Sequence, residues 1–493
     1  MKKISLIIIS AITIFSGIFA QNVDDALRYS QIFYGGTARF LSMGGAFTAL
    51  GGDLSTLSQN PAGLGLFRSS EVTISPQLFH IKTSANFNGI STDYLYNFNL
   101  SQVGIANNFI SNNKESGLIN LNFGYSFNRT NNLNTSARIE GIQSKSSLAD
   151  YWVDLGKGTY YTDLGGAEGI AYDAWIIDTI TGSGAEQYAT VYSNYGDNPP
   201  SIYGQNIRRI ISNEGFTGEH AFSIGGNFSN KFFFGATLGI SRLRYTGHYE
   251  HLESASDALP SGFQNFTYTD HYENTGTGFS LKIGTIIKPV ESLRIGFAFH
   301  SPTIYRINEY FYDNISSNFE GNDHYEFSND PMRYNYALTT PFRAIGGVAI
   351  QVKKLALLSA EYEFVDYSAA RFSETGDDYD YSEKNLEIKN SLKPTGNLRF
   401  GGELRLSKFY LRSGFGYYGK AFKAGEDNDH MDHTSISFGA GYREQNISVD
   451  FGFASLQNSQ KYILYTSQAG NAISNLNITK NLFTVTVGYK FSY

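Results

Sequence analysis

In the final stretch of the chain, 482–493, the last ten residues alternate strictly between polar and apolar side chains. Its aliphatic and aromatic members fall on one face: Val485, Val487, Tyr489, Phe491 and Tyr493. Thr, Gly, Lys and Ser occupy the other face. Successive side chains of a strand point to opposite faces, so a period of two predicts a β-strand here.

The same alternation recurs throughout the chain and predicts about fourteen strands. Their approximate ranges are 71–81, 92–105, 116–129, 219–230, 231–250, 265–288, 292–312, 333–352, 355–373, 395–406, 408–423, 433–444, 446–459 and 481–493. Short connections such as 353–354 alternate with long polar ones such as 313–332. Short turns at one end and long loops at the other are typical of a transmembrane antiparallel β-barrel. The predicted fold class is therefore all-β.

One connection, 130–218, is far longer than the others and contains both tryptophans, Trp152 and Trp175. Two pieces of it, 150–155 and 207–211, have the pattern of short amphipathic helices. Long loops of this kind are usually functional or disordered, and the many aromatic residues favour a folded extracellular cap.

Residues 1–20 have the pattern of a Sec-type signal peptide. Lys2 and Lys3 precede an apolar run, and Ala20 stands at the expected cleavage point. No later window is apolar enough to predict a transmembrane helix. The mean hydropathy of −0.26 agrees with a barrel, whose strands alternate lipid-facing apolar residues with polar residues facing the lumen.

Composition narrows the possible functions. Charged residues make up 17% of the chain, below the ~25% usual for globular proteins. The absence of cysteine excludes disulfides, thiolate catalysis and zinc–thiolate sites. A net charge of −7 disfavours a nucleic-acid partner.

No motif predicts a cofactor, a metal site or an enzyme. The pairs His248/His251 and His430/His433 have a spacing that a metal can use, but both fall in predicted loops or strand ends, which favours solvated side chains. The sequence has neither a G-x-S-x-G nucleophile motif nor a phosphate-binding P-loop.

Residues 35–67 break the strand pattern, because they are rich in Gly, Ala and small polar residues. They end in Asn60, Pro61, Ala62 and Gly63, and a proline without an N–H cannot join a strand ladder. We predict that 21–70 forms a hatch inside the lumen of the barrel built by 71–493, with the motif as its hinge-like end. A solvated periplasmic tail is the alternative.

Three motifs carry a resemblance to a known family. They are Gly44-Gly45-Ala46-Phe47 followed by Asp53 and by 60–64, the strand 293–302 with its Ser301-Pro302 ending, and 361–368 with its Asp-aromatic-Ser ending. Together they resemble the outer-membrane long-chain fatty-acid transporters and their toluene and xylene transport relatives. The terminal aromatic residue, Tyr493, resembles the signal by which the assembly machinery recognises outer-membrane barrels.

This resemblance implies a fourteen-stranded, monomeric barrel in the outer membrane of a Gram-negative bacterium, surrounded by lipid. It implies passive uptake of hydrophobic small molecules, either long-chain fatty acids or aromatic hydrocarbons, with lateral release through a gap at a kinked third strand. Gly117 and Gly124 are the candidate bend, because glycine in a strand often marks one. The candidate apolar ligand contacts of the hatch are Phe40, Leu41, Met43, Phe47, Leu50, Leu54 and Leu57.

Two other functions stay open at this point. Some barrels that resemble this family serve protein export, as a shuttle for substrates of the type IX secretion system. A receptor for haemin or another hydrophobic ligand is the third reading, and the histidines give it no support.

Overall fold

The computed structural model describes residues 22–110, 117–180, 186–193, 201–376 and 379–491. The predicted signal peptide, 1–20, and Tyr493 lie outside these ranges. Among the described residues, no helix combines the length and apolar character needed to cross a membrane.

The helical elements are all short. They are α1 (Val23–Ser30), α2 (Ala38–Ser42), η1 (Leu54–Ser58), η2 (Pro61–Leu66), α3 (Leu148–Gly156), η3 (Tyr161–Asp163), α4 (Gly166–Asp173), η4 (Glu320–Asn322), η5 (Tyr367–Ala369) and α5 (Ser382–Ser391). Many strands are much longer than in a typical sheet. They are β1 (Ser70–Asn86), β2 (Ile90–Ile110), β3 (Leu118–Asn132), β4 (Thr135–Gln143), β5 (Ile177–Thr179), β6 (Tyr188–Thr190), β7 (Gln205–Phe228), β8 (Phe232–Ser254), β9 (Phe263–Val290), β10 (Leu293–His300), β11 (Ile304–Phe319), β12 (His324–Ser328), β13 (Met332–Thr339), β14 (Arg343–Val352), β15 (Ala356–Asp366), β16 (Arg371–Glu374), β17 (Pro394–Leu406), β18 (Phe409–Tyr418), β19 (His433–Glu444), β20 (Ile447–Thr466) and β21 (Asn471–Phe491).

Nineteen of these strands form one antiparallel sheet that closes on itself, because β1 pairs with β2 on one side and with β21 on the other. They correspond to the fourteen crossings of a closed barrel. β4, β11, β14 and β16 continue the strands that precede them, and β12 adds a hairpin beyond the wall. The predicted all-β, fourteen-stranded antiparallel barrel is confirmed.

The alternation seen in the sequence sets the two faces of the wall. On β8, Phe232, Phe234 and Leu238 point outward and are exposed, whereas Phe233 and Thr237 point inward and are buried. Exposed aromatic and aliphatic side chains recur on the outer face of β21. An apolar outer band with a more polar interior is the arrangement of a membrane-spanning barrel.

The predicted boundaries of the cap were wrong. Strands β3, β4 and β7 occupy much of 130–218, so the part outside the wall is only 144–204. The predicted helix at 207–211 is part of β7, paired with β4 and β8. Ile207 and Ile211 both face inward, which a four-residue spacing allows on a helix and on a strand alike. The other predicted helix, 150–155, lies within α3.

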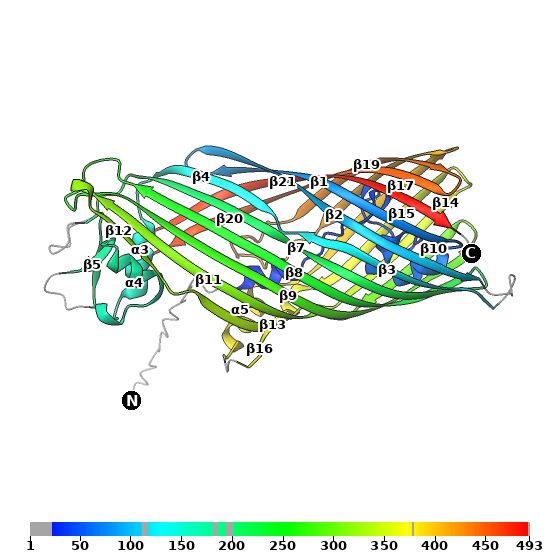
Figure 1. The fold of residues 1–493 in the computed structure, drawn as a ribbon, viewed down its shortest axis with the longest axis horizontal. Helices are drawn as coiled ribbons and strands as arrows, with labels where there is room; N and C mark the ends of the chain where they lie inside the picture. Colours follow the sequence, from blue (N-terminus) through cyan, green and yellow to red (C-terminus); the bar gives the residue numbers. More distant parts are fainter. Residues whose placement is uncertain (1–21, 111–116, 181–185, 194–200, 377–378, 492–493) are drawn as a thin grey trace, which may run out of the picture.

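The N-terminal helices occupy the interior of the barrel. Figure 1 shows the blue segment from α1 to η2 enclosed by the wall, while α3 and α4 form a lobe at the opposite end from the C-terminus. We call the end with this lobe the cap end and the opposite end, with its short connections, the turn end. The predicted N-terminal hatch inside the lumen is thus present.

Candidate functional site: hatch, wall break and cavity

The hatch body, residues 37–67, is seated by its own apolar side chains. The seven candidate ligand contacts are at most 7% exposed. Phe40, Met43, Phe47 and Leu50 form one cluster with the wall, and Leu54 and Leu57 belong to another. None of the seven, Leu41 included, lines the cavity described below. Their burial favours seating of the hatch over direct contact with a ligand.

Wall glycines let the hatch backbone approach closely. A Cβ built on Gly414 would lie 2.2 Å from the Gly44 nitrogen, and one on Gly452 would lie 2.5 Å from the Ala38 carbonyl oxygen. Any side chain at these inward positions would push the hatch away. The glycine-rich strands of the sequence therefore serve close packing of two backbones.

The Asn60-Pro61-Ala62-Gly63 motif is fixed on several sides. The Asn60 amide donates to the Thr48 carbonyl at 2.6 Å and to the Thr285 carbonyl of β9 at 3.2 Å. Its Oδ1 accepts from the Ala62 N–H at 3.1 Å and caps η2. The Gly63 N–H donates to the Asn60 carbonyl at 2.9 Å. This arrangement favours an anchor between hatch and wall over the hinge-like end that the sequence suggested.

Replacing Asn60 with Ala is expected to loosen this anchor without preventing barrel assembly. It removes an N-cap worth about 1 kcal/mol, and it leaves the Thr48 carbonyl without its donor. Hydrogen exchange of the amides around Asn60 should accelerate roughly 5- to 30-fold if local opening becomes 1–2 kcal/mol easier. Asn477→Ala, on the exposed face of β21, is the matched control. Unchanged exchange in Asn60→Ala would show that the motif does not hold the hatch.

Charged wall residues also reach the hatch. Glu361 of β15 accepts from the Thr48 N–H and from the Gln59 side-chain amide, each at 2.9 Å. Arg399 of β17 bonds both Glu361 and Glu363. Buried charges are tolerated only when they are paired in this way. The hydrogen bonds from Thr48 and Gln59 to Glu361 form only when the hatch lies in this position against the wall.

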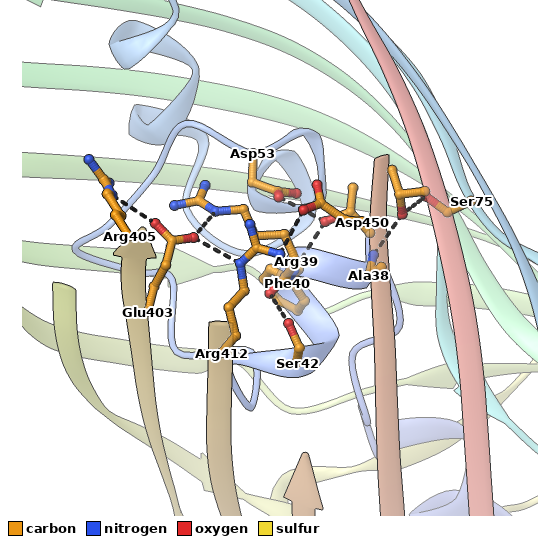
Figure 2. A network of polar contacts seen from close by, with 12 residues as sticks. Ala38, Arg39, Phe40, Ser42, Asp53, Ser75, Glu403, Arg405, Arg412 and Asp450 are labelled. Carbon is orange, nitrogen blue, oxygen red and sulfur yellow. Dashed lines mark hydrogen bonds and ion pairs between the residues drawn. The ribbon is translucent and has the colours of Figure 1, made fainter. Parts of the chain in front are cut away.

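A second charged network surrounds Arg39 of α2 (Figure 2). Its Nε donates to Glu403 of β17 at 2.9 Å, and Arg412 of β18 donates to the same carboxylate oxygen at 2.8 Å. Arg412 also bonds Asp450 of β20 at 2.6 Å. Arg39 is the hatch's contribution to a cluster otherwise built from wall strands.

The wall ladder breaks between β2 and β3. These strands pair from Ile110 and Asn120 as far as Gln102 and Asn128, and pairing stops there although β2 continues to Ile90. The register also shifts between β3 and β7 at Arg129–Asn131. From this point toward the cap end, β2 stays paired with β1 as far as Ile90. The wall is thus interrupted beside the third strand.

The N-terminal segment Phe33–Gly36 occupies the break. The Phe33 N–H donates to the Thr130 carbonyl and the Gly35 N–H to the Arg129 carbonyl, each at 2.9 Å. On the other side, Ser101 Oγ of β2 bonds both the N–H and the carbonyl of Gly36 at 2.9 Å. A short extended segment therefore stands where strand pairing is missing.

Neither glycine proposed as a bend lies at this break. Gly124 is paired on both sides, with Ala106 and with Ser223, and a Cβ there would lie 2.8 Å from Leu57 of the hatch. Gly117 lies before β3 at the turn end. The sequence signal that marks the break is Pro76, because a proline within a strand indicates a bulge, and the β1–β2 register shifts beside it.

A cavity of about 350 Å³ lies on the cap side of the hatch. It is bounded by α1, by the junction of β3 and β4, and by strands including β7, β8, β20 and β21. Phe33 and residues 131–133 line it, so cavity and break share a wall. Its volume is at the lower end of the usual range for ligand pockets, ~300–1,000 Å³.

The cap is attached to β8 through a buried carboxylate. Glu253 accepts from Ser147 Oγ at 2.6 Å and from the Tyr192 hydroxyl at 3.0 Å. Asp150 completes a capping box with Ser147 at the start of α3. Burial raises the pKa of Asp150 to about 6, although hydrogen bonds from Ser147 and Tyr203 oppose the shift.

The histidine pairs do not converge on a metal. His251 is buried and bonds Glu253, whereas His248 faces His271. His433 packs against Phe33 with its ring tilted, whereas His430 is exposed. The described residues contain no group of three or more His, Cys, Asp or Glu side chains that could hold an ion.

Comparison with known proteins agrees with the fold. The family model of the outer membrane protein transport proteins (OMPP1/FadL/TodX) matches residues 188–493. The crystal structure of a Pseudomonas aeruginosa FadL homologue has a TM-score of 0.56 at 13% identity, covering 94% of this chain and 100% of that chain. The toluene transporter TodX of P. putida has a TM-score of 0.53 at 10% identity, with 94% and 100% covered. Curated protein sequences gave no significant match.

The family match covers more than half of the chain, and these neighbours are transport proteins, not enzymes. The chain belongs to the OMPP1/FadL/TodX family of outer-membrane transport proteins.

Proposed function

We propose that this protein takes up hydrophobic small molecules passively across the outer membrane of a Gram-negative bacterium and releases them sideways into the membrane. The observation that supports this most is the β2–β3 break, occupied by the non-covalently held segment Phe33–Gly36. A ligand in the adjoining cavity would contact Phe33 of that segment and the end of β3, because both line the cavity. Displacing the segment would connect the cavity to the lipid.

The energetics permit such displacement. Four hydrogen bonds hold the segment to the two strands, two of them through Ser101. At about 0.5–1.5 kcal/mol net each, they stabilise the closed state by about 2–6 kcal/mol. If the closed state is favoured by only about 2 kcal/mol, the open state is populated thermally, so opening needs no external energy source. Ligand that contacts Phe33 can shift this equilibrium by binding the open state better.

The hatch body stays in place in this mechanism. Its charged and amide anchors, such as Arg39–Glu403 and Asn60–Thr285, join it to the wall. Only the preceding segment, Phe33–Gly36, needs to move. The surrounding lipid receives the ligand, and one chain forms the complete pathway. Assembly of the barrel depends on its C-terminal segment, which carries the aromatic residue Tyr493.

Uptake by the full-length protein tests the proposal. The protein is reconstituted in liposomes, and entry of labelled palmitate and of toluene into the lipid is compared with that in protein-free liposomes. Faster transfer of at least one of them supports the proposal, and no acceleration of either contradicts it. Deletion of the gene separates the alternatives: loss of secreted-protein attachment would indicate protein export, and loss of haemin uptake a haemin receptor.

A further inference from the structure

A groove of about 510 Å³ lies on the outer, lipid-facing side of the wall, on strands β14, β15, β17 and β18. Figure 1 shows β14, β15 and β17 near the C-terminus, at the turn end. The sides of the groove are outward-pointing apolar side chains that are between 41% and 54% exposed: Val348, Ile350, Leu358, Phe400 and Phe415. Its floor includes the small residues Ala360, Gly402 and Ser413 of three neighbouring strands. The groove therefore opens to the membrane, on strands other than those that border the break.

The hairpin turn next to the groove carries two lysines without an acidic partner. Lys353 and Lys354 connect β14 to β15, and both are exposed. Within the described part of the chain, neither forms an ion pair with a carboxylate. The lysines at the two flanking turns are paired instead, because Lys288 lies 2.5 Å from Glu291 and Lys408 bonds a glutamate of β19. The β14–β15 turn is therefore a local surplus of positive charge at the edge of the membrane.

Groove and turn are close enough for one lipid molecule to contact both. Ile350 and Leu358 line the groove, three residues before Lys353 and four residues after Lys354. A strand rises about 3.3 Å per residue, so the near edge of the groove lies roughly 10–13 Å from the turn. A phospholipid whose phosphate lies at the lysines thus has the upper part of its acyl chains beside the groove.

The groove and the lysines contribute in different ways. Acyl chains are as apolar as the groove lining, so the groove holds a lipid only through shape and van der Waals contact and does not distinguish head groups. A lysine at the membrane surface does distinguish them, because it attracts an anionic lipid roughly fivefold over a neutral one. Position along the wall therefore comes from the groove, and selectivity comes from the turn.

We propose that the groove and the β14–β15 turn together bind one anionic phospholipid of the periplasmic leaflet, with an acyl chain in the groove and the phosphate at Lys353 and Lys354. The family of this chain belongs to the outer membrane, and the short turns of such barrels lie on the periplasmic side, where the leaflet consists of phospholipids. The site lies outside the barrel, so it does not depend on the proposed uptake through the lumen.

Native mass spectrometry of the full-length protein tests the head-group contact. The protein is released from vesicles of phosphatidylethanolamine and phosphatidylglycerol, and the lipids that stay bound are counted. Phosphatidylglycerol should be enriched about 5- to 25-fold over its share of the vesicle lipids, and Lys353→Gln/Lys354→Gln should abolish most of this enrichment. Lys231→Gln is the matched control, because Lys231 is also exposed at a hairpin turn, between β7 and β8, but lies away from the groove. It should change the enrichment by less than about twofold.

Filling the groove tests the acyl-chain contact. A Cβ built on Gly402 would meet no atom closer than 3.6 Å, so Gly402→Leu should fold normally and occupy the groove, and Ala360→Leu fills the same floor. Either variant should lower the retention of both lipids roughly 3- to 10-fold, because several carbon–carbon contacts are lost. Gly346→Leu is the matched control: a Cβ there meets only the Phe297 ring, at 3.8 Å, and Gly346 does not line the groove.

Three results would overturn the inference. The first is retention of the two lipids by the native protein in the proportions of the vesicle, and the second is undiminished enrichment in the double lysine variant. The third is unchanged lipid retention in both Gly402→Leu and Ala360→Leu. A two-chain species that disappears in Gly402→Leu but persists in Gly346→Leu would also overturn it, because the groove would then be occupied by a second copy of this chain.

Discussion

Oxidation of a Gly35→Cys/Ser101→Cys variant is expected to stop ligand transfer almost completely, and reduction should restore it. A Cβ built on Gly35 lies 3.1 Å from Ser101 Oγ, close to the reach of a disulfide, although it would also approach the Arg129 carbonyl at 2.7 Å and require a small shift. The bond would tie the segment in the break to β2. The chain has no native cysteine, so no other disulfide can form.

The matched control ties the hatch body to the wall instead. In Thr48→Cys/Gly347→Cys, a Cβ on Gly347 lies 3.3 Å from Thr48 Cβ, near the ~3.5–4.5 Å span of a disulfide. Because the proposal leaves the hatch body in place, transfer of palmitate in liposomes should be the same before and after oxidation. A block in both variants would indicate that the whole hatch moves. Normal transfer through the oxidised Gly35/Ser101 variant would exclude release at this break.

The barrel is predictable from sequence because its main signal is local. Each crossing must expose apolar side chains to lipid on one face, so alternation appears wherever the wall lies in the membrane. Beyond the membrane this requirement ends, and polar residues occur on both faces. β7 therefore continues to Gln205 through residues whose pattern also fits a helix, and the cap was predicted too large.

The position of the hatch in the chain can be predicted from the sequence, but the contacts that anchor it to the wall cannot. Its composition separates it from the strands, yet its anchors depend on partners far away in sequence, such as Asn60 with Thr285 and Arg39 with Glu403. The same limit applies to Lys282 of β9, because only the fold shows that Glu219 neutralises it.

Arg39→Ala is expected to unseat the hatch while the barrel stays folded. The side chain is 9% exposed and its partner Glu403 is 0% exposed, so the substitution removes one cation from a buried cluster. Breaking a buried pair costs about 3–5 kcal/mol, and the lower end applies here because Arg412 still neutralises Glu403. Amides of residues 37–67 should then exchange about 100-fold faster or more, whereas those of the wall ladder should not.

Arg405→Ala is the matched control. It tests whether the hatch is held by the bond between Arg39 and Glu403 or by the neutralisation of Glu403 alone. Arg405 donates to the same Glu403 carboxylate at 3.1 Å, but its side chain is 32% exposed. Its contact is therefore largely screened by water, and its loss should cost about 0–1 kcal/mol. If both variants loosen the hatch equally, the neutralisation of Glu403 is what matters. If only Arg39→Ala does so, and its barrel also conducts small hydrophilic solutes across a bilayer, the bond between α2 and β17 is what keeps the lumen closed.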